Sequence, residues 1–422
     1  MPPPYHMRRV IINAGPIAHL SGDGPLSGRA MSAESLVYPA GMGLVVDDHV
    51  IEKIAPTEEI SSEYSGIDQK LIIDLNGDAI IPGLVDSHAH LLWDGDRSQE
   101  VRWKQQGQTY RQIAELGGGI SSTVSATRKA TDSRLLQLGV ERLNAALRNG
   151  TTHMEIKSGY GLDTESECRL LNIGKQLGAI ENLPSLDLTW LGAHAVPPNG
   201  TIESYVEEIM ADQLPAIIEQ GLARSTDVFC EPGWFNLEQT EEILRAAKSG
   251  GMDLRLHIDE FSDGGGGELA AEMEVSTADH AHYTNDDARQ KMHEAGVNTG
   301  FLPGTPYSMG DNYPPFKHCT EAEWNWSFAS DFNPNCRILS LPFLGSVLVQ
   351  RNGMDPLASL VACTRNSAET TPHPSGLTHG QIVEGGIANL NIVDGKHWEA
   401  WCLQPGHSPF KKTILEGELI SH

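Results

Sequence analysis

Two histidines that follow a short apolar run constrain this chain more than any other feature. The run is Ile80-Ile81-Pro82-Gly83-Leu84-Val85, and it leads within a few residues to His88 and His90. Because alternate side chains of a strand point to the same side, both imidazoles would project together from one strand end. Such an imidazole pair on one rigid element is a typical ligand pair for Zn²⁺ or iron. The segment therefore predicts half of a metal site.

Partners for this pair lie at the ends of two later apolar segments. The strand-like run 253–260 contains His257, and the run 326–334 contains Asp331 just before a turn-forming Asn-Pro. An aspartate before Asn-Pro is usually a turn residue. Asp331 is interpreted as a metal ligand only because it follows three histidines that also lie at strand ends. In a parallel barrel the carboxyl ends of the strands gather on one face. We therefore predict that His88, His90, His257 and Asp331 bind one metal ion and leave a position for water.

The pattern along the chain predicts three parts. Residues 1–75 carry short β-like runs such as 43–54, which predict hairpins. From 76 to 381, strand-like runs alternate with amphipathic helical patterns, for example at 134–148, and this alternation is typical of parallel strands with crossover helices. From 382 to 422, short β runs separated by glycines return. The expected class is therefore α/β.

Several segments together resemble a known family. The histidine pair is followed by Lys157-Ser158-Gly159-Tyr160-Gly161, by Gly192-Ala193-His194-Ala195-Val196-Pro197 and by Asp331-Phe332-Asn333-Pro334. In this order they resemble the imidazolonepropionases, hydrolases of histidine degradation within the amidohydrolase superfamily. The resemblance covers roughly residues 75–335. It implies a (β/α)₈ TIM-type barrel at 76–381, with a small β-sandwich formed by residues 1–75 and 382–422.

The resemblance also implies an activity. This would be metal-dependent hydrolysis of the cyclic amide of 4-imidazolone-5-propanoate to N-formimidoyl-L-glutamate, with one Zn or Fe ion per chain. Another deaminase or cyclic-amide hydrolase of the superfamily is the alternative, and Arg97 disfavours a neutral base because such a base has no carboxylate. A purely structural metal protein is disfavoured because a structural site would close all four positions and need no adjacent acid.

Three residues are the candidates for proton transfer. Glu260 lies three residues after His257 and is the first candidate for activating water. Asp331 could share this role from the metal, and His280 matches a family position that would polarise the oxyanion or orient the water. Lys157 corresponds to a lysine that some superfamily members carboxylate to bridge two metals, but with one metal we interpret it as structural.

The resemblance transfers substrate contacts to six further positions. Arg97 would bind the propionate through its planar guanidinium, and Tyr160, His194 and Glu260 would contact the substrate. Asn333 would contact it beyond the metal aspartate. The chain departs from the family next, because Asn335 and Cys336 stand where Gly and Ser or Thr are usual, and a thiol is a poor hydrogen-bond donor.

Composition limits the partners. A net charge of −26 disfavours nucleic acid and anionic membranes. No apolar run is long enough to span a bilayer, no signal peptide is recognisable, and the six cysteines lack Cys-x-x-Cys spacing, so we expect a cytoplasmic enzyme. A homodimer is the default. An anionic small-molecule substrate would need a locally positive pocket, for which Arg97, the metal and the histidines are the candidates.

Overall fold

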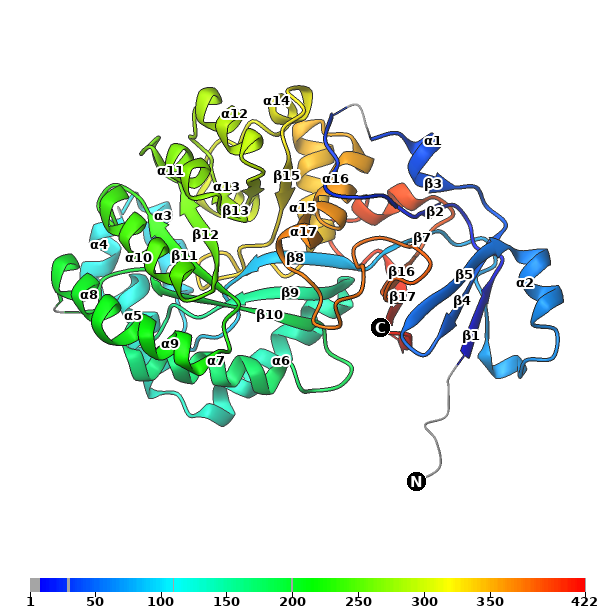
Figure 1. Ribbon diagram of the computed structural model, residues 1–422, viewed down its shortest axis with the longest axis horizontal. Helices are drawn as coiled ribbons and strands as arrows, with labels where there is room; N and C mark the ends of the chain where they lie inside the picture. The colour runs from blue at the N-terminus through cyan, green and yellow to red at the C-terminus, as the bar shows by residue number, and fades with distance from the viewer. Residues whose placement is uncertain (1–7, 29–30, 109, 199, 422) are drawn as a thin grey trace.

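A parallel barrel forms the centre of the molecule in the computed structural model, which describes residues 8–28, 31–108, 110–198 and 200–421 (Figure 1). Its eight strands lie in chain order, each hydrogen-bonded to the next. They are β8 (Leu84–Ala89), β9 (Thr151–Lys157), β10 (Ser185–Ala193), β11 (Ser225–Cys230), β12 (Asp253–Ile258), β13 (Thr277–His280), β14 (Asn298–Phe301) and β15 (Trp326–Phe328). This order confirms the predicted α/β barrel.

The segment after β15 closes the barrel against its first strand. Ala89 and Phe332 form a parallel bridge. The amide of Asp331 donates to the carbonyl of His88 at 3.0 Å, and the amide of His90 donates to the carbonyl of Phe332 at 2.8 Å. This closure brings the histidine pair and the late aspartate side by side, although more than half of the chain separates them.

Helices surround the barrel. The predicted helix at 134–148 is confirmed by α6 (Asp132–Arg148), whose N-terminus is capped by the Thr131 hydroxyl accepting the Arg134 amide, and whose buried face contains Leu135, Leu143 and Leu147. Other crossover helices are α5 (Gly119–Lys129), α7 (Thr164–Leu177), α9 (Leu214–Gln220), α10 (Leu237–Ser249), α11 (Gly266–Met273), α12 (Asp286–Glu294), α13 (Gly304–Met309), α14 (Phe316–Glu321), α16 (Pro356–Ala362) and α17 (Arg365–Thr370).

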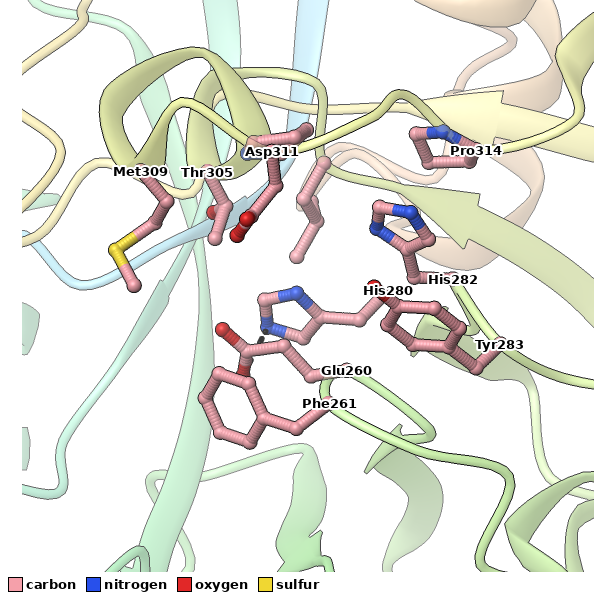
Figure 2. A pocket seen from close by; sticks show the side chains of 11 residues that line it. Glu260, Phe261, His280, His282, Tyr283, Thr305, Met309, Asp311 and Pro314 are labelled. Carbon is pink, nitrogen blue, oxygen red and sulfur yellow. Dashed lines mark ion pairs between the residues drawn. The ribbon is translucent and has the colours of Figure 1, made fainter.

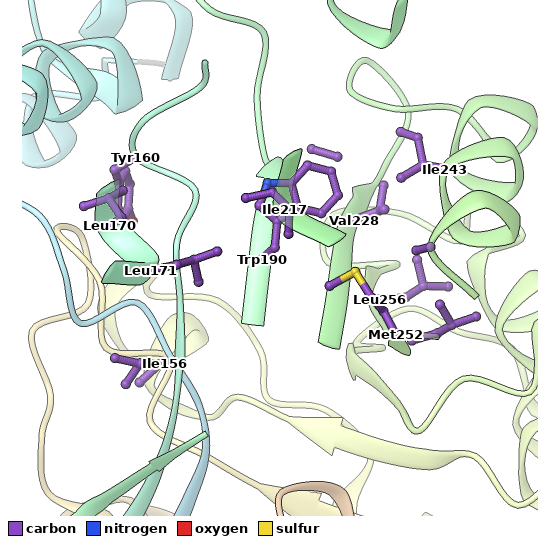
Figure 3. Close-up of a cluster of buried hydrophobic side chains, with 14 of the residues drawn as sticks. Ile156, Tyr160, Leu170, Leu171, Trp190, Ile217, Val228, Ile243, Met252 and Leu256 are labelled. Carbon is purple, nitrogen blue, oxygen red and sulfur yellow. The ribbon is translucent and has the colours of Figure 1, made fainter. Parts of the chain in front are cut away.

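The largest buried cluster lies between the strands and these helices (Figure 3). Trp190 on β10 is fully buried in it, and its indole N–H donates to the Gln213 side chain at 3.0 Å. Val228 and Leu256 on the next strands and Ile243 on α10 pack in the same cluster. Because each buried aliphatic side chain contributes about 1.5–3 kcal/mol, this cluster gives the strand ends a rigid base.

Both chain ends build the two smaller sheets. β1 (Arg8–Ile12), β4 (Met42–Asp47), β5 (Val50–Pro56) and β6 (Ile72–Asp74) form one sheet, in which the antiparallel β4–β5 pair confirms the predicted hairpin. The other contains β2 (Ile17–Ala18), β3 (Val37–Tyr38), β7 (Ile80–Pro82), β16 (Leu390–Val393), β17 (Phe410–Leu415) and β18 (Glu418–Ser421). Ile11, Leu44, Leu390 and Ile414 share one buried cluster between them.

The limits of the small domain stay a prediction. The predicted boundary at 75/76 precedes β7, which pairs antiparallel with β16 and so belongs to the sheet shared by both chain ends. Within the described part of the chain, no helix combines the length and the hydropathy that a membrane crossing requires. All six cysteines are free thiols.

Candidate active site

A cavity of about 470 Å³ lies among the carboxyl ends of the barrel strands and the loops that follow them. With the exception of His88, every residue that the sequence analysis assigned to metal, catalysis or substrate lines it. These are His90, Arg97, Tyr160, His194, His257, Glu260, His280, Asp331, Asn333, Asn335 and Cys336. The remaining His88 is buried beside His90 and His257, with ring centroids 5.3 and 4.5 Å away.

The four predicted metal ligands converge on one point. One ring nitrogen each of His88, His90 and His257 lie within 4.8 Å of one another. The Oδ1 atom of Asp331 is 3.7 Å from His88 Nε2 and 3.4 Å from His90 Nε2. All four side chains are almost fully buried. Such a group of buried donors has the composition of a metal-binding site.

Acidic residues on neighbouring strands orient two of these histidines. His88 Nδ1 lies 2.6 Å from Asp279 Oδ2, and His257 Nδ1 lies 3.0 Å from Asp227 Oδ1. Because a carboxylate only accepts, each Nδ1 carries a hydrogen, and Nε2 is the ring nitrogen that is left for a metal. Carboxylate–histidine pairs of this kind are usual behind metal ligands. On the aspartate, Thr305 donates its hydroxyl to Asp331 Oδ2 at 2.5 Å and leaves Oδ1 open.

Unpartnered buried atoms provide a test of whether a metal fits. His88 Nε2, His257 Nε2 and Asp331 Oδ1 are buried without a hydrogen-bond partner. A buried polar atom without a partner destabilises the folded protein. A single electron-pair acceptor placed between these three atoms would remove that cost for all of them. A divalent cation satisfies all three at once, and the donor set therefore fits a divalent metal ion.

The protonation states agree with this fit. Burial lowers the pKa of His88 well below its usual range and also lowers the pKa of His90, so both rings are neutral. Burial alone would raise the pKa of Asp331, but its contacts with His90, His280 and Thr305 outweigh burial and hold the pKa below its usual range. Neutral imidazole and ionised carboxylate are the forms that bind metals.

Lys157 is buried between two carboxylates, those of Glu155 and Asp227. Its Nζ lies 2.8 Å from Asp227 Oδ2 and 2.9 Å from Glu155 Oε1, and the side chain is fully buried. Burial would lower the pKa of Lys157, but the two carboxylates outweigh it and raise the pKa. A charged lysine that supports Asp227, and through it His257, agrees with our structural interpretation of Lys157.

Glu260 and His280 face each other where the cavity meets a smaller neighbouring pocket, and both residues line both spaces (Figure 2 shows the smaller pocket). Their Oε2 and Nε2 atoms are 3.5 Å apart. Burial, with the nearby charges of Asp331 and Glu231, raises the pKa of Glu260 well above its usual range, and burial lowers the pKa of His280 to about 3. The pair therefore combines a carboxyl group that holds a proton readily with a neutral imidazole.

Backbone conformation also marks these strand ends. Asp259, His280 and Asp331 have φ values of +48°, +64° and +47°, in the left-handed region. Non-glycine residues there are disfavoured, and they cluster at functional sites where surrounding contacts hold them. Glu231, at the end of β11, provides one such contact, because its carboxylate accepts the amides of Glu260 and Phe261.

On the opposite side of the cavity, Arg97 is already engaged. Its Nε and Nη2 atoms donate to the two carboxylate oxygens of Glu100 at 2.6 and 2.9 Å, and Glu100 also accepts the amide of Gly119 at 2.8 Å. Glu100 is not predicted by the sequence analysis. Within the described part of the chain, no hydrogen bond of Arg97 Nη1 is found, so this side of the guanidinium is left for a ligand, while Glu100 balances its charge.

His194 and Tyr160 are two further aromatic residues that line the cavity. His194 stacks on His90 with ring centroids 5.2 Å apart, and Tyr160 lies 5.3 Å from His194. His194 Nδ1 donates to the carbonyl of Gly159 at 2.9 Å, which leaves Nε2 as an acceptor. Burial lowers the pKa of His194 to about 3, so the ring is neutral.

The loop after Asp331 is held together by its own side chain. Asn333 Oδ1 accepts the amides of Asn335 at 2.8 Å and Cys336 at 3.1 Å, and Nδ2 donates to the Asp331 carbonyl at 2.8 Å. Burial raises the pKa of the Cys336 thiol to about 12, so this side chain is protonated. A lining residue that the sequence analysis missed is Lys104, whose Nζ lies 3.5 Å from Asn335 Oδ1. Its only signal is its place seven residues after Arg97.

Comparison with known proteins identifies the family of this chain. Residues 192–410 match the model of the Amidohydrolase family. The chain is 37% identical to the imidazolonepropionase of Shewanella oneidensis over 82% of this chain and 85% of that protein. It is 35% identical to that of Symbiobacterium thermophilum, over 97% and 96% of the two chains.

The chain belongs to the imidazolonepropionase family. A third relative of this family, from Haloarcula marismortui, is 35% identical over 91% of this chain and 90% of its own. Imidazolonepropionases are thus matched in bacteria and in an archaeon, and membership makes the chain a hydrolase.

Solved structures share the imidazolonepropionase-family fold at lower identity. A 5-methylcytosine deaminase from Klebsiella pneumoniae superimposes with a TM-score of 0.69 at 18% identity, covering 98% of both chains. The ochratoxinase of A. niger gives 0.67 at 16% identity, over 98% of this chain and 96% of that one. These likenesses support the barrel with its small terminal sheets.

Proposed function

We propose that this protein hydrolyses 4-imidazolone-5-propanoate to N-formimidoyl-L-glutamate, a step of histidine degradation. The observation that carries the proposal is a cavity at which three converging histidines and an ionised aspartate meet the Glu260–His280 pair and Arg97. Full-length relatives named imidazolonepropionase support the same substrate.

The metal part of the proposal is one ion per chain, Zn or Fe, held by His88, His90, His257 and Asp331. Such an ion lowers the pKa of a water molecule towards neutrality and polarises a carbonyl oxygen. The open Nε2 atoms of His88 and His257 and the open Oδ1 of Asp331 support these residues as ligands, because their second polar atoms are engaged by Asp279, Asp227 and Thr305. His90 belongs to the same group because one of its ring nitrogens lies within 4.8 Å of those of His88 and His257.

In this proposal Glu260 moves the proton. Hydrolysis adds water to the ring carbonyl carbon and breaks its bond to the ring nitrogen, so one proton must travel from the water to that nitrogen. A carboxylate whose pKa is raised by burial is a stronger base than an exposed glutamate, and once protonated it is a ready acid. Neutral His280, 3.5 Å away, can donate a hydrogen bond to the developing oxyanion or orient the water. Asp331 is the second candidate base.

The remaining lining residues would orient the substrate. His194 Nε2 can accept a ring N–H, and Tyr160 packs at the same edge of the cavity. Arg97 would bind the propionate through its free Nη1 side. The side chain of Asn333 holds the loop that carries Asn335 and Cys336, so Asn333 would shape the wall of the pocket by positioning this loop. A cytoplasmic homodimer remains our expectation, and light scattering of the purified protein tests the dimer.

A direct assay tests the proposal. Purified protein, with about one metal per chain by elemental analysis, should remove the ultraviolet absorbance of 4-imidazolone-5-propanoate and release no ammonia. Cytosine serves as the comparison substrate, because ammonia release from it would indicate a deaminase instead. Loss of neither substrate would contradict the proposed function, and two metals per chain would contradict the mononuclear centre.

A further inference from the structure

The charges around the cavity leave the binding of an anion unexplained. The protein carries a net charge of −26, and both Glu260 and Asp331 line the cavity. Arg97 is the expected cation, but its guanidinium forms a two-point ion pair with Glu100, which is only 3% exposed. Because this pair has no net charge, Arg97 by itself does not make its end of the cavity positive.

Lys104 is a second cation in the same cavity. It lies near the end of α3 (Gln99–Gln105), whereas Arg97 precedes that helix, and both side chains line the cavity. Its Nζ contacts the neutral amide oxygen of Asn335 at 3.5 Å. The ion pairs found among the described residues do not include Lys104.

We propose that Lys104 determines specificity for anionic substrates, supplying the uncompensated positive charge that binds the substrate carboxylate between its ammonium group and the free side of Arg97. This inference rests on the proposed function and deepens it. In this arrangement Arg97, held rigidly by Glu100, sets the direction of the carboxylate, whereas Lys104 contributes the attraction. The Asn335 amide positions the ammonium group when no ligand is bound.

The environment of Lys104 agrees with this role. Burial lowers the pKa of Lys104, while the charge of Glu100 acts to raise it and the charge of Arg97 acts to lower it. Together Arg97, Glu100 and Lys104 carry one net positive charge. A half-buried ammonium group with only a neutral contact gains stability from an incoming carboxylate, because a charge-assisted hydrogen bond in a low-dielectric site is stronger than a neutral one. This role also explains asparagine at position 335, where glycine is usual in the family. The side-chain amide of Asn335 reaches the ammonium group of Lys104, and glycine has no side chain to do so.

The test compares Lys104→Met and Lys104→Arg with the parent enzyme. Binding is measured by calorimetry with imidazole-4-propanoate, a ring that carries the propionate but no amide to hydrolyse, and with 4-ethylimidazole, which lacks the charge. Lys104→Met should weaken binding of the acid and raise KM for 4-imidazolone-5-propanoate roughly 10- to 100-fold, with kcat within about threefold. Binding of 4-ethylimidazole should not change, and Lys104→Arg should retain most of the affinity.

A matched control removes the same charge elsewhere. Lys317 on α14 is exposed and lies outside the cavity lining, so Lys317→Met should leave KM and both affinities unchanged. Equal affinity of the parent and Lys104→Met for imidazole-4-propanoate would overturn the role of Lys104 while the hydrolysis itself stands. An equal loss for 4-ethylimidazole would also overturn it, because the side chain would then act through the shape of the cavity. Failure of the parent enzyme to hydrolyse the substrate would instead refute the proposed function.

Discussion

Replacing Asp279 by asparagine tests whether the buried acids hold the metal ligands in place. Asp279 Oδ2 accepts from His88 Nδ1 at 2.6 Å, while Oδ1 accepts the Thr277 hydroxyl at 2.6 Å. Asparagine keeps the size and one acceptor but loses the charge, so His88 is held less firmly and its Nε2 is a weaker donor to a metal. Changes to such partners usually reduce metal affinity 10- to 100-fold, which is about 1.4–2.7 kcal/mol.

Affinity is best measured by competition with a chromophoric zinc chelator. Burial raises the pKa of Asp279 to about 6, so the measurement belongs above that pH, where the carboxylate is ionised. Asp287→Asn on α12 is the matched control, because this aspartate is exposed and does not line the cavity. Urea unfolding of the metal-free proteins separates a loss of affinity from a loss of folding. If Asp279→Asn binds zinc as tightly as Asp287→Asn, the idea that the second acid orients His88 is refuted.

Three further outcomes are expected. Glu260→Gln should lower kcat by about 10²–10⁴ at unchanged metal content, since the amide cannot take the proton, and near-normal turnover would move this role to Asp331 or His280. Arg97→Met should lower the free energy of unfolding by about 3–5 kcal/mol, because it leaves the buried Glu100 without its ion-pair partner. The double variant Arg97→Met/Glu100→Met should recover most of this loss in urea titrations. Equal urea midpoints for the two variants would contradict the pairing. Burial raises the pKa of Glu231 from its ordinary 4.5 to about 7, so the folded protein holds this proton longer than the unfolded chain and loses stability as pH rises between these values. Glu231→Gln should remove at most about 3 kcal/mol of that decline, and parallel stability–pH curves would speak against it.

Local patterns in the sequence were sufficient to predict individual strands and helices and the side of the strand on which His88 and His90 lie. An apolar run followed by His88 and His90 specifies a strand and the side to which both rings point, because the alternation of a strand depends only on neighbouring residues. Helix α6 could be predicted for the same reason, since its buried face repeats with the helical period. The family resemblance added the roles of Glu260, Arg97 and His194, and the structure places all three side chains in one cavity.

Contacts between distant strands depended on the tertiary structure alone. Asp279 reaches His88 across 191 residues and Asp227 reaches His257 across 30, and neither aspartate stands out in its own segment. Which acid meets which histidine is decided by strand order and register, for instance by the pairing of His257 with Asp279 on adjacent strands, and these are properties of the closed barrel.

The electrostatic state of the cavity was likewise decided by packing. In the sequence, Arg97 without the family resemblance is most simply interpreted as a surface ion-pair residue, and no pattern marks Glu100 or Lys104. Only the fold buries Glu100 against Gly119, turns Arg97 into half of a neutral pair and leaves Lys104 facing the cavity without a counter-ion among the described residues. Sequence determined which charges are present, and burial determined which of them remain available to a substrate, because desolvation and pairing depend on neighbours that are brought together only when the chain folds.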